Sequence, residues 1–244
     1  MSTPVSLKIT DVHECDRQVG AQMTKLQSKV FSCRACVDKG ESFRFEFAVN
    51  GYPKKFPPTI PDNGEAKVLF VALCPRPTRN YVLDWAMSGP DEFATLGSNL
   101  NQDGDSYLES YEKERFYRPF VEIAAEAYKG KRFDTVATVS DLYFCALPSR
   151  ELREDSPCAN LHLLGLIAEV RPRIIITKGN RPMHYLERFG DGRRFDYRNV
   201  YSINIDGFHT TLLPVKWWDL NSHAREPART WLLENIRVLD SDAW

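Results

Sequence analysis

The stretch SDLYFCALPSRELREDSPCANLHLLGL, residues 140–166, indicates both the fold and the site of this chain. A strand-like run ends at Asp141, and Cys145 and Cys158 then bracket a polar loop before an apolar helix begins. Far upstream, Cys33 and Cys36 form a second pair with C-x2-C spacing. Two pairs supply four thiolates, the number that holds a zinc ion or an iron–sulfur cluster.

Strand-like and helix-like segments alternate outward from this stretch. Apolar runs predict strands at 67–73, 135–142 and 173–177, and a hairpin about Asp206-Gly207 joins strand material at 200–205 and 210–213. Apolar positions spaced by three and four predict a helix at 14–31, and further helices are expected at 113–128, 157–170, 180–189 and 221–238. This order predicts a three-layer α/β/α fold with a central, mostly parallel four-stranded sheet. We expect one domain over residues 1–244, with its site at the carboxyl ends of the strands.

Composition limits the classes of function. The 244 residues are 43% hydrophobic and 27% charged, and no apolar run approaches the roughly eighteen residues of a membrane helix. The N-terminus has early acidic residues and no apolar core of a signal peptide, so we expect a cytoplasmic protein that does not enter a membrane. The formal net charge of −1 does not indicate a polyanion partner, so a nucleic acid would have to bind to a local basic surface.

The cysteine spacing favours a cluster over other uses of the thiols. Six cysteines without an export signal argue against a disulfide framework, because the cytosol keeps thiols reduced. A zinc ribbon usually draws its second pair from another close C-x2-C, whereas Cys145 and Cys158 lie thirteen positions apart. This wider spacing suits a 4Fe-4S cubane. The alternative is that both cysteines are small buried hydrophobes.

The order of these motifs resembles the iron–sulfur, family 4-like branch of the uracil-DNA glycosylase superfamily. The resemblance runs from about Cys33 to Leu239 and includes the strand and turn IIITKG at 174–179. It implies a DNA-binding monomer of that fold in which a 4Fe-4S cluster is held by four cysteines, namely Cys33, Cys36, Cys145 and Cys158.

The chain departs from this family at the catalytic motifs. The family's Gly-Glu-Ala-Pro-Gly motif would lie on 72–76 and keep only Pro75, with Cys74 where several branches have a water-positioning Asp. The family's His-Pro-Ser motif would lie on 213–215, so its histidine is missing. His209 and His223 are near enough in sequence to replace it.

Asp141 stands where the resemblance places an Asn that reads a flipped uracil. A carboxylate only accepts hydrogen bonds, and its natural partner on a base edge is the exocyclic amine of cytosine. If burial raises the pKa of Asp141, its proton can also pass to cytosine N3. The alternative is that Asp141 caps the turn after its strand. Asp84, Asp141 and Asp219 are all candidates for the group that activates water.

Other residues are candidates for contact with base and backbone. By the resemblance, Cys74, Pro75 and Tyr81 would lie beside the flipped base, and Trp217 and Trp218 would lie in a duplex-probing loop. Further candidates for DNA contact are the cationic residues Lys178, Lys216 and Arg225. Each tryptophan is alternatively core or rim packing.

These observations predict a DNA glycosylase that hydrolyses the N-glycosidic bond of a flipped cytosine-type base. A modified cytosine confined to viral DNA, such as a glucosylated hydroxymethylcytosine, would be a safe target for a defence enzyme. Two alternatives stay open: a repair glycosylase for uracil or other deaminated bases, and a catalytically inactive DNA-binding module.

Overall fold

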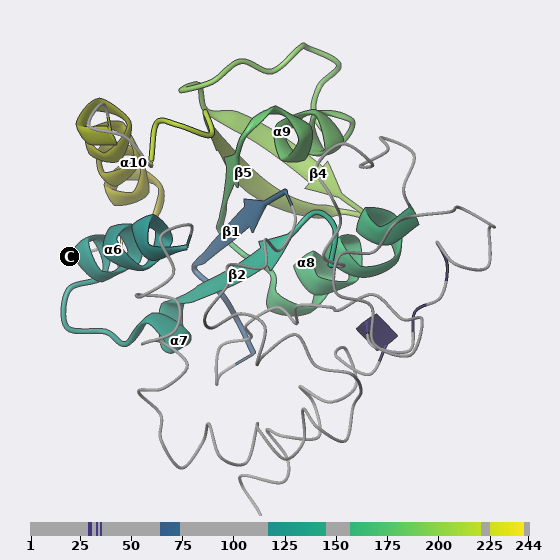
Figure 1. The fold of residues 1–244 in the computed structure, drawn as a ribbon, viewed down its shortest axis with the longest axis horizontal. Helices are drawn as coiled ribbons and strands as arrows, with labels where there is room; N and C mark the ends of the chain where they lie inside the picture. Colours follow the sequence, from purple (N-terminus) through teal and green to yellow (C-terminus); the bar gives the residue numbers. More distant parts are fainter. Residues whose placement is uncertain are drawn as a thin grey trace, which may run out of the picture.

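The described residues form an α/β structure around a five-stranded mixed sheet (Figure 1). The computed structural model describes residues 29–30, 33, 35, 64–73, 117–144, 157–220 and 225–241. The strands are β1 (Val68–Ala72), β2 (Ala137–Asp141), β3 (Ile174–Lys178), β4 (Tyr201–Ile205) and β5 (Phe208–Val215). Among these residues, no helix has the length and apolarity needed to cross a bilayer.

The sheet has the order β2-β1-β3-β5-β4. The first four strands are parallel, and β4 is added antiparallel to the edge at β5. All residues of β1, β2 and β3 are buried, as expected for parallel strands covered on both faces. Four strands were predicted, and the sheet has five because both arms of the predicted hairpin join it.

The predicted hairpin turn at Asp206-Gly207 is confirmed. Asp206 has φ 50° and Gly207 has φ 85°, and the flanking residues Ile205 and Phe208 are paired. Two successive residues with positive φ are the mark of a type I′ turn, whose twist matches that of the strands it joins.

Helices cover both faces of the sheet. The helices α6 (Arg118–Ala127) and α10 (Arg225–Leu239) share one buried core with β1, β2, β3 and β5. The helices α8 (Leu164–Val170) and α9 (Asn180–Glu187), with the π-helical turn η1 (Ala159–Leu163), share a second core on the other face. Figure 1 shows α6 and α10 on one side of the sheet and α8 and α9 on the other.

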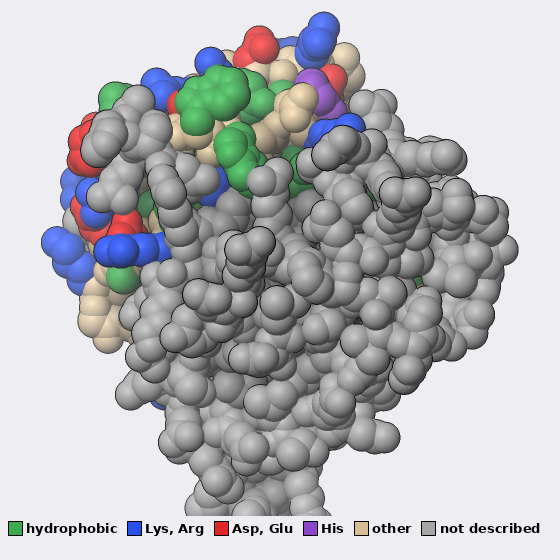
Figure 2. Space-filling view, in the orientation of Figure 1, with side chains coloured by type: hydrophobic (Ala, Val, Ile, Leu, Met, Phe, Trp, Pro, Cys, Tyr) green, Lys and Arg blue, Asp and Glu red, His purple; other side chains and the backbone are tan. Residues whose placement is uncertain are grey.

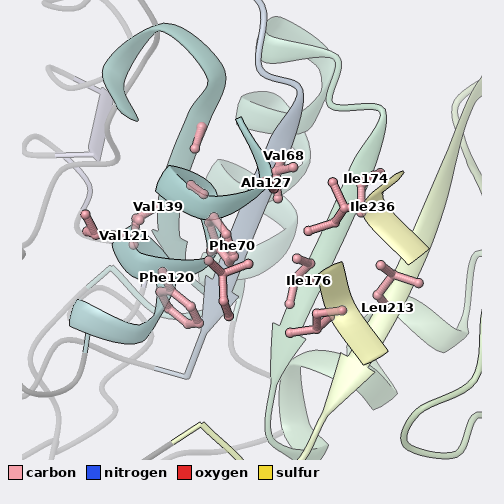
Figure 3. Packing of buried hydrophobic residues seen from close by; sticks show 14 of the residues in the cluster. Val68, Phe70, Phe120, Val121, Ala127, Val139, Ile174, Ile176, Leu213 and Ile236 are labelled. Atoms are coloured by element: carbon pink, nitrogen blue, oxygen red, sulfur yellow. The ribbon is translucent and has the colours of Figure 1, made fainter. Parts of the chain in front are cut away.

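The core beneath α6 and α10 is built on a stack of aromatic rings. The ring of Phe70, on β1, lies 4.7 Å from that of Phe120 and 6.5 Å from that of Phe133, centroid to centroid. Figure 3 shows Phe70 and Phe120 in contact, with Ile176 of β3 and Ile236 of α10 in the same cluster. Alternate residues of each strand point to this face. The same alternation determines the face of the sheet toward which the last side chain of each strand points.

The predicted start of β2 was wrong. Residues 135 and 136 were expected to start a strand, but they end the short helix α7 (Phe133–Val136) that precedes β2. The Thr135 hydroxyl donates to the Arg132 carbonyl at 2.7 Å, and the Thr135 N–H donates to the same oxygen at 3.1 Å. Local side-chain bonds of this kind compete with a strand ladder.

Candidate functional site

Asp141 and Lys178 are the last residues of β2 and β3, at the carboxyl edge of the sheet. Each lies two residues beyond a core residue of its own strand, Val139 and Ile176, which faces the α6/α10 core. Because side chains alternate along a strand, both groups point to that same face. Asp141 is 2% exposed and Lys178 has no exposed surface.

The N-terminal end of α6, which includes its N-cap residue Tyr117, contacts both of these groups. The Tyr117 hydroxyl donates a 2.9 Å hydrogen bond to Asp141 Oδ2. Phe120 presents its ring to Lys178, whose Nζ lies 5.3 Å from the ring centroid. The same Nζ lies 5.2 Å from the ring of Trp217, just after β5. Segments distant in sequence therefore build one buried acid–amine site.

Burial shifts both titrations toward neutrality. Desolvation raises the pKa of Asp141 to about 7, although the Tyr117 hydrogen bond and the charge of Lys178 act to lower it. Desolvation lowers the pKa of Lys178 to about 7, while the charge of Asp141 acts to raise it. Near neutral pH the site therefore holds a carboxyl that can donate a proton and an amine that can be uncharged.

Within the described residues, the carboxyl of Asp141 does not cap the turn after β2, which was the alternative considered from the sequence. The N–H groups of Leu142 and Tyr143 donate instead to the carbonyls of Ala72 and Leu73, at 2.8 and 3.0 Å. Oδ1 of Asp141 is buried and has no hydrogen-bond partner within the described part of the chain. A buried polar atom in this state is rare and calls for a ligand, a proton or a water.

We expect the hydroxyl of Tyr117 to tune this carboxyl. In Tyr117→Phe the hydrogen bond that lowers the pKa of Asp141 is lost, so the pKa should move above about 7 and the protonated form should persist to higher pH. Carbon-13 NMR titration of the Asp141 carboxyl measures the shift. The matched control is Tyr128→Phe, which removes an equally short 2.9 Å bond to the buried Asp240. A pKa that moves down in Tyr117→Phe, or that moves equally in the control, would contradict this assignment.

The sequence matches no protein-family model and no curated protein.

Asp219 is bound to a different partner. It is 4% exposed, and its Oδ2 accepts from Nε and Nη2 of Arg198 at 3.3 and 3.2 Å. Arg198 has the left-handed φ of 58° and is joined to β5 by a bond from its N–H to the Pro214 carbonyl. The carboxylate of Asp219 thus anchors this loop, whereas Asp141 is the buried acid beside the amine.

Of the residues after β5 that were predicted to contact DNA, one packs on the core and others lie at the surface. Trp217 packs on the α6/α10 core, which agrees with the packing alternative. Trp218 is 59% exposed. Lys216 lies between aromatic rings, with Nζ 5.8 Å from that of Trp218 and 5.7 Å from that of Tyr197. Lys216 and Trp218 thus present a cation and an aromatic face at the carboxyl edge.

Lys178, the His-Pro-Ser positions and His209 lie in other environments than the sequence predicted. Lys178, predicted to contact DNA as one of the exposed basic groups, is buried beside Asp141. Leu213 and Val215, where the family's His-Pro-Ser would lie, are core residues of β5, and Val215 ends that strand opposite Lys178, so Lys216 and Trp217 follow it. His209 lies near the start of β5, at the opposite end of that strand, and its Nε2 is 3.2 Å from Asn204 Nδ2. It does not replace the lost histidine.

The described charges on the visible face are mixed in sign. Figure 2 shows Lys and Arg side chains next to Asp and Glu along the upper and left rim of the described part. Several arginines are ion-paired, such as Arg173 with Asp240 and Arg229 with Glu126. A cavity of about 640 Å³ lies elsewhere, beside β4, where Arg193, Asn199 and His209 are among the residues that line it.

The predicted cluster site is described only in part. Cys158 is buried, and its Sγ accepts a 3.3 Å hydrogen bond from the N–H of Phe144, the residue before Cys145. Val30 belongs to the same core as Cys158, and the N–H of Cys33 donates to the Val30 carbonyl. Both cysteine pairs therefore have a described member or neighbour on the α8/α9 side of the sheet. Backbone N–H bonds to sulfur are a normal support for cluster ligands.

Other predicted residues lie outside the described residues: Cys36, Cys145, Cys74, Pro75, Tyr81, Asp84 and His223. Arg225 begins α10, and its side chain is likewise outside the description. Within the described ranges, no group of three or more potential metal ligands occurs. The sequence did not reveal Tyr117, because nothing in its local pattern shows that it reaches a carboxyl 24 positions later.

Proposed function

We propose that this protein is a DNA glycosylase that hydrolyses the N-glycosidic bond of a flipped cytosine-type base. The observation that carries the proposal is the buried carboxyl of Asp141, whose Oδ1 lacks a partner within the described residues. Leaving a buried polar group unpaired costs about 1–3 kcal/mol. A base edge that supplies the missing hydrogen bond recovers this free energy on binding.

The protonated carboxyl of Asp141 is complementary to the edge of cytosine. Tyr117 fixes Oδ2 as an acceptor, which leaves Oδ1 as the oxygen that carries a proton toward the base. The O–H donates to cytosine N3, and Oδ2 can accept a second bond from the exocyclic amine. The pKa of about 7 keeps a large part of the carboxyl protonated near neutral pH.

Transfer of that proton also assists the chemistry. When the C1′–N1 bond breaks, its electron pair passes to the base, and a proton moved from Asp141 to N3 neutralises the charge that develops. Water then attacks C1′ and loses a proton to the solvent, and Asp141 takes up a proton again, which completes the hydrolysis. Uracil carries a hydrogen at N3 and offers no basic ring nitrogen there, so it cannot take the proton at this position. This difference supports a cytosine-type base over uracil.

The exposed edge supplies the expected contacts to DNA. Base flipping requires groups that hold the phosphates and stack on exposed bases. Lys216 and the exposed Trp218 follow β5, at the same edge of the sheet as Asp141 and Lys178. The four parallel strands and the helices on both faces are compatible with the glycosylase fold that the sequence resembles.

The proposed substrate is a modified cytosine. Ordinary cytosine fills every host genome, so an enzyme that excised it would destroy the host's DNA. Hydroxymethylated and glucosylated cytosines occur in viral DNA, so their excision would spare the host's own DNA. An enzyme with this specificity would act in defence against viruses. A 4Fe-4S cluster held by Cys33, Cys36, Cys145 and Cys158 is part of the same proposal.

A second candidate is a repair glycosylase for uracil, which the raised pKa of Asp141 favours. A neutral carboxyl has one donor and one acceptor, the same pattern as the amide that it replaces in the related family. It can therefore bind O4 and N3–H of uracil. The two candidates differ in the base released, not in the residues that bind it.

The deciding experiment measures base release from duplexes with cytosine, 5-hydroxymethylcytosine, its glucosylated form, uracil or hypoxanthine, at several pH values. We expect release only from the modified cytosines, falling about tenfold per pH unit well above pH 7 as Asp141 loses its proton. Release of uracil or hypoxanthine would establish the repair alternative. Binding with no release from any duplex would establish an inactive DNA-binding module.

The cluster is tested separately by its iron. Anaerobically purified protein should be brown and contain four irons. Cys158→Ser should lose these irons, because each thiolate makes one of the four bonds that hold the cluster. Cys15→Ser, outside the two pairs, is the control that should keep its colour and iron. A colourless protein with one bound zinc would contradict the cluster.

A further inference from the structure

Lys178 is a buried lysine that the proposed hydrolysis does not use. It ends β3 on the same face as Asp141, and its Nζ lies between the rings of Phe120 and Trp217, at 5.3 and 5.2 Å. A lysine rarely has no exposed surface, because its charge is costly away from water. Lysines desolvated among apolar groups are a recurring form of amine nucleophile.

We propose that Lys178 is the nucleophile of a second activity, the cleavage of the DNA strand at an abasic site through a Schiff base to C1′ of the sugar. The inference rests on the proposed glycosylase function, because base release creates this aldehyde in the same site. Three features of the geometry carry it: the burial of Lys178, its position at the carboxyl edge, and the acid that shares its face.

The reaction balances without an oxidant, reductant or metal. The lone pair of Nζ attacks C1′ of the aldehyde and forms a carbinolamine. The carbinolamine oxygen takes one proton from Asp141 and one from the amine and leaves as water, which gives the protonated imine. The carboxylate of Asp141 then removes a proton from C2′. The electrons of that bond expel the 3′ phosphate by β-elimination, and water finally hydrolyses the imine to release Lys178.

The protonation states suit these steps. Attack needs an uncharged amine, and burial lowers the pKa of Lys178 to about 7. Loss of water needs a proton donor, and Asp141 keeps its proton up to a similar pH. The N-terminal end of α6 holds both groups, through the Tyr117 hydroxyl on Asp141 and the Phe120 ring beside Lys178.

The test is reductive trapping on DNA with a preformed abasic site. Borohydride converts the imine to a stable amine and links protein to DNA, and mass spectrometry of the peptides locates the link. We expect a link at Lys178, reduced to background in Lys178→Met and in Lys178→Arg, whose guanidinium is a poor nucleophile. The matched control is Lys131→Gln, which removes an exposed lysine 5.9 Å from the ring of Tyr128 and should trap like the wild type.

The outcomes separate this inference from the proposed function. No link in the wild type, or a link at another lysine, would overturn the lyase inference, and release of modified cytosine in a parallel assay would then leave the glycosylase standing. A link at Lys178 without release of any base would support the inference and overturn the glycosylase proposal. Circular dichroism of Lys178→Met verifies that a lost link does not reflect lost folding.

Discussion

Asp141→Asn should lower kcat for the release of a modified cytosine by about 10²–10⁴-fold, with a much smaller change in KM. An Asn keeps a donor and an acceptor toward the base, and its oxygen can still accept from the Tyr117 hydroxyl. It cannot give a proton to N3. The variant therefore retains recognition and loses the proposed general acid, which single-turnover kinetics on the modified duplex will measure.

Asp219→Asn is the matched control for this substitution. Asp219 is also a buried acid near the carboxyl edge, but its carboxylate is held by Arg198. We expect its kcat to stay within a few-fold of the wild type. Folding is tested at the same time: ionised Asp141 is net unfavourable where it lies, so Asp141→Asn should melt at an equal or higher temperature than the wild type at pH 8. A large loss of kcat in Asp219→Asn alone would transfer the acid–base role to that residue.

Phe70→Ala should be the most destabilising single change in the α6/α10 core, at about 3–5 kcal/mol. The ring is fully buried, and it stacks on Phe120 and Phe133 between β1 and α6. Its removal leaves a cavity beneath the helix turn that carries Tyr117. The free energy of unfolding, from urea denaturation followed by circular dichroism, measures the loss.

Two comparisons make this prediction specific. Phe70→Leu retains most of the apolar volume and should cost clearly less than Phe70→Ala. Val238→Ala, on the exposed face of α10, should change the free energy of unfolding by less than about 0.5 kcal/mol. Equal effects of Phe70→Ala and Val238→Ala would mean that this core does not stabilise the sheet.

The parallel sheet was predictable because its strands have a strong local signal. β1 is a continuous apolar run, β3 begins with three isoleucines, and Asp206-Gly207 has the residues that a type I′ turn demands. The start of β2 was not predictable, since the Thr135 bonds to Arg132 belong to a helical turn that the strand-forming residues conceal. The predicted hairpin implied that β4 pairs with β5, but the predicted sheet of four strands did not include β4.

The place of the candidate site could be predicted from the sequence, but the residues that contact Asp141 there could not. Alternating elements placed it at the carboxyl ends of the strands, and Asp141 could be singled out there from the sequence. The partners of Asp141 could not be, because Tyr117 and Lys178 approach it only through the packing of α6 and the order of the strands. Lys178 was assigned to the surface for the same reason, since burial of a lysine has no signature in its neighbours along the chain.

Both the release of the base and the attack by Lys178 depend on the acid–base state of Asp141, and carbon-13 NMR titration of its carboxyl measures that state most directly. The assigned resonance, identified by its absence in Asp141→Asn, should titrate with a midpoint near pH 7. A midpoint below pH 5 would mean that the carboxyl is ionised and solvated at neutral pH. In that case Asp141 could neither donate a proton to a base nor assist attack by Lys178.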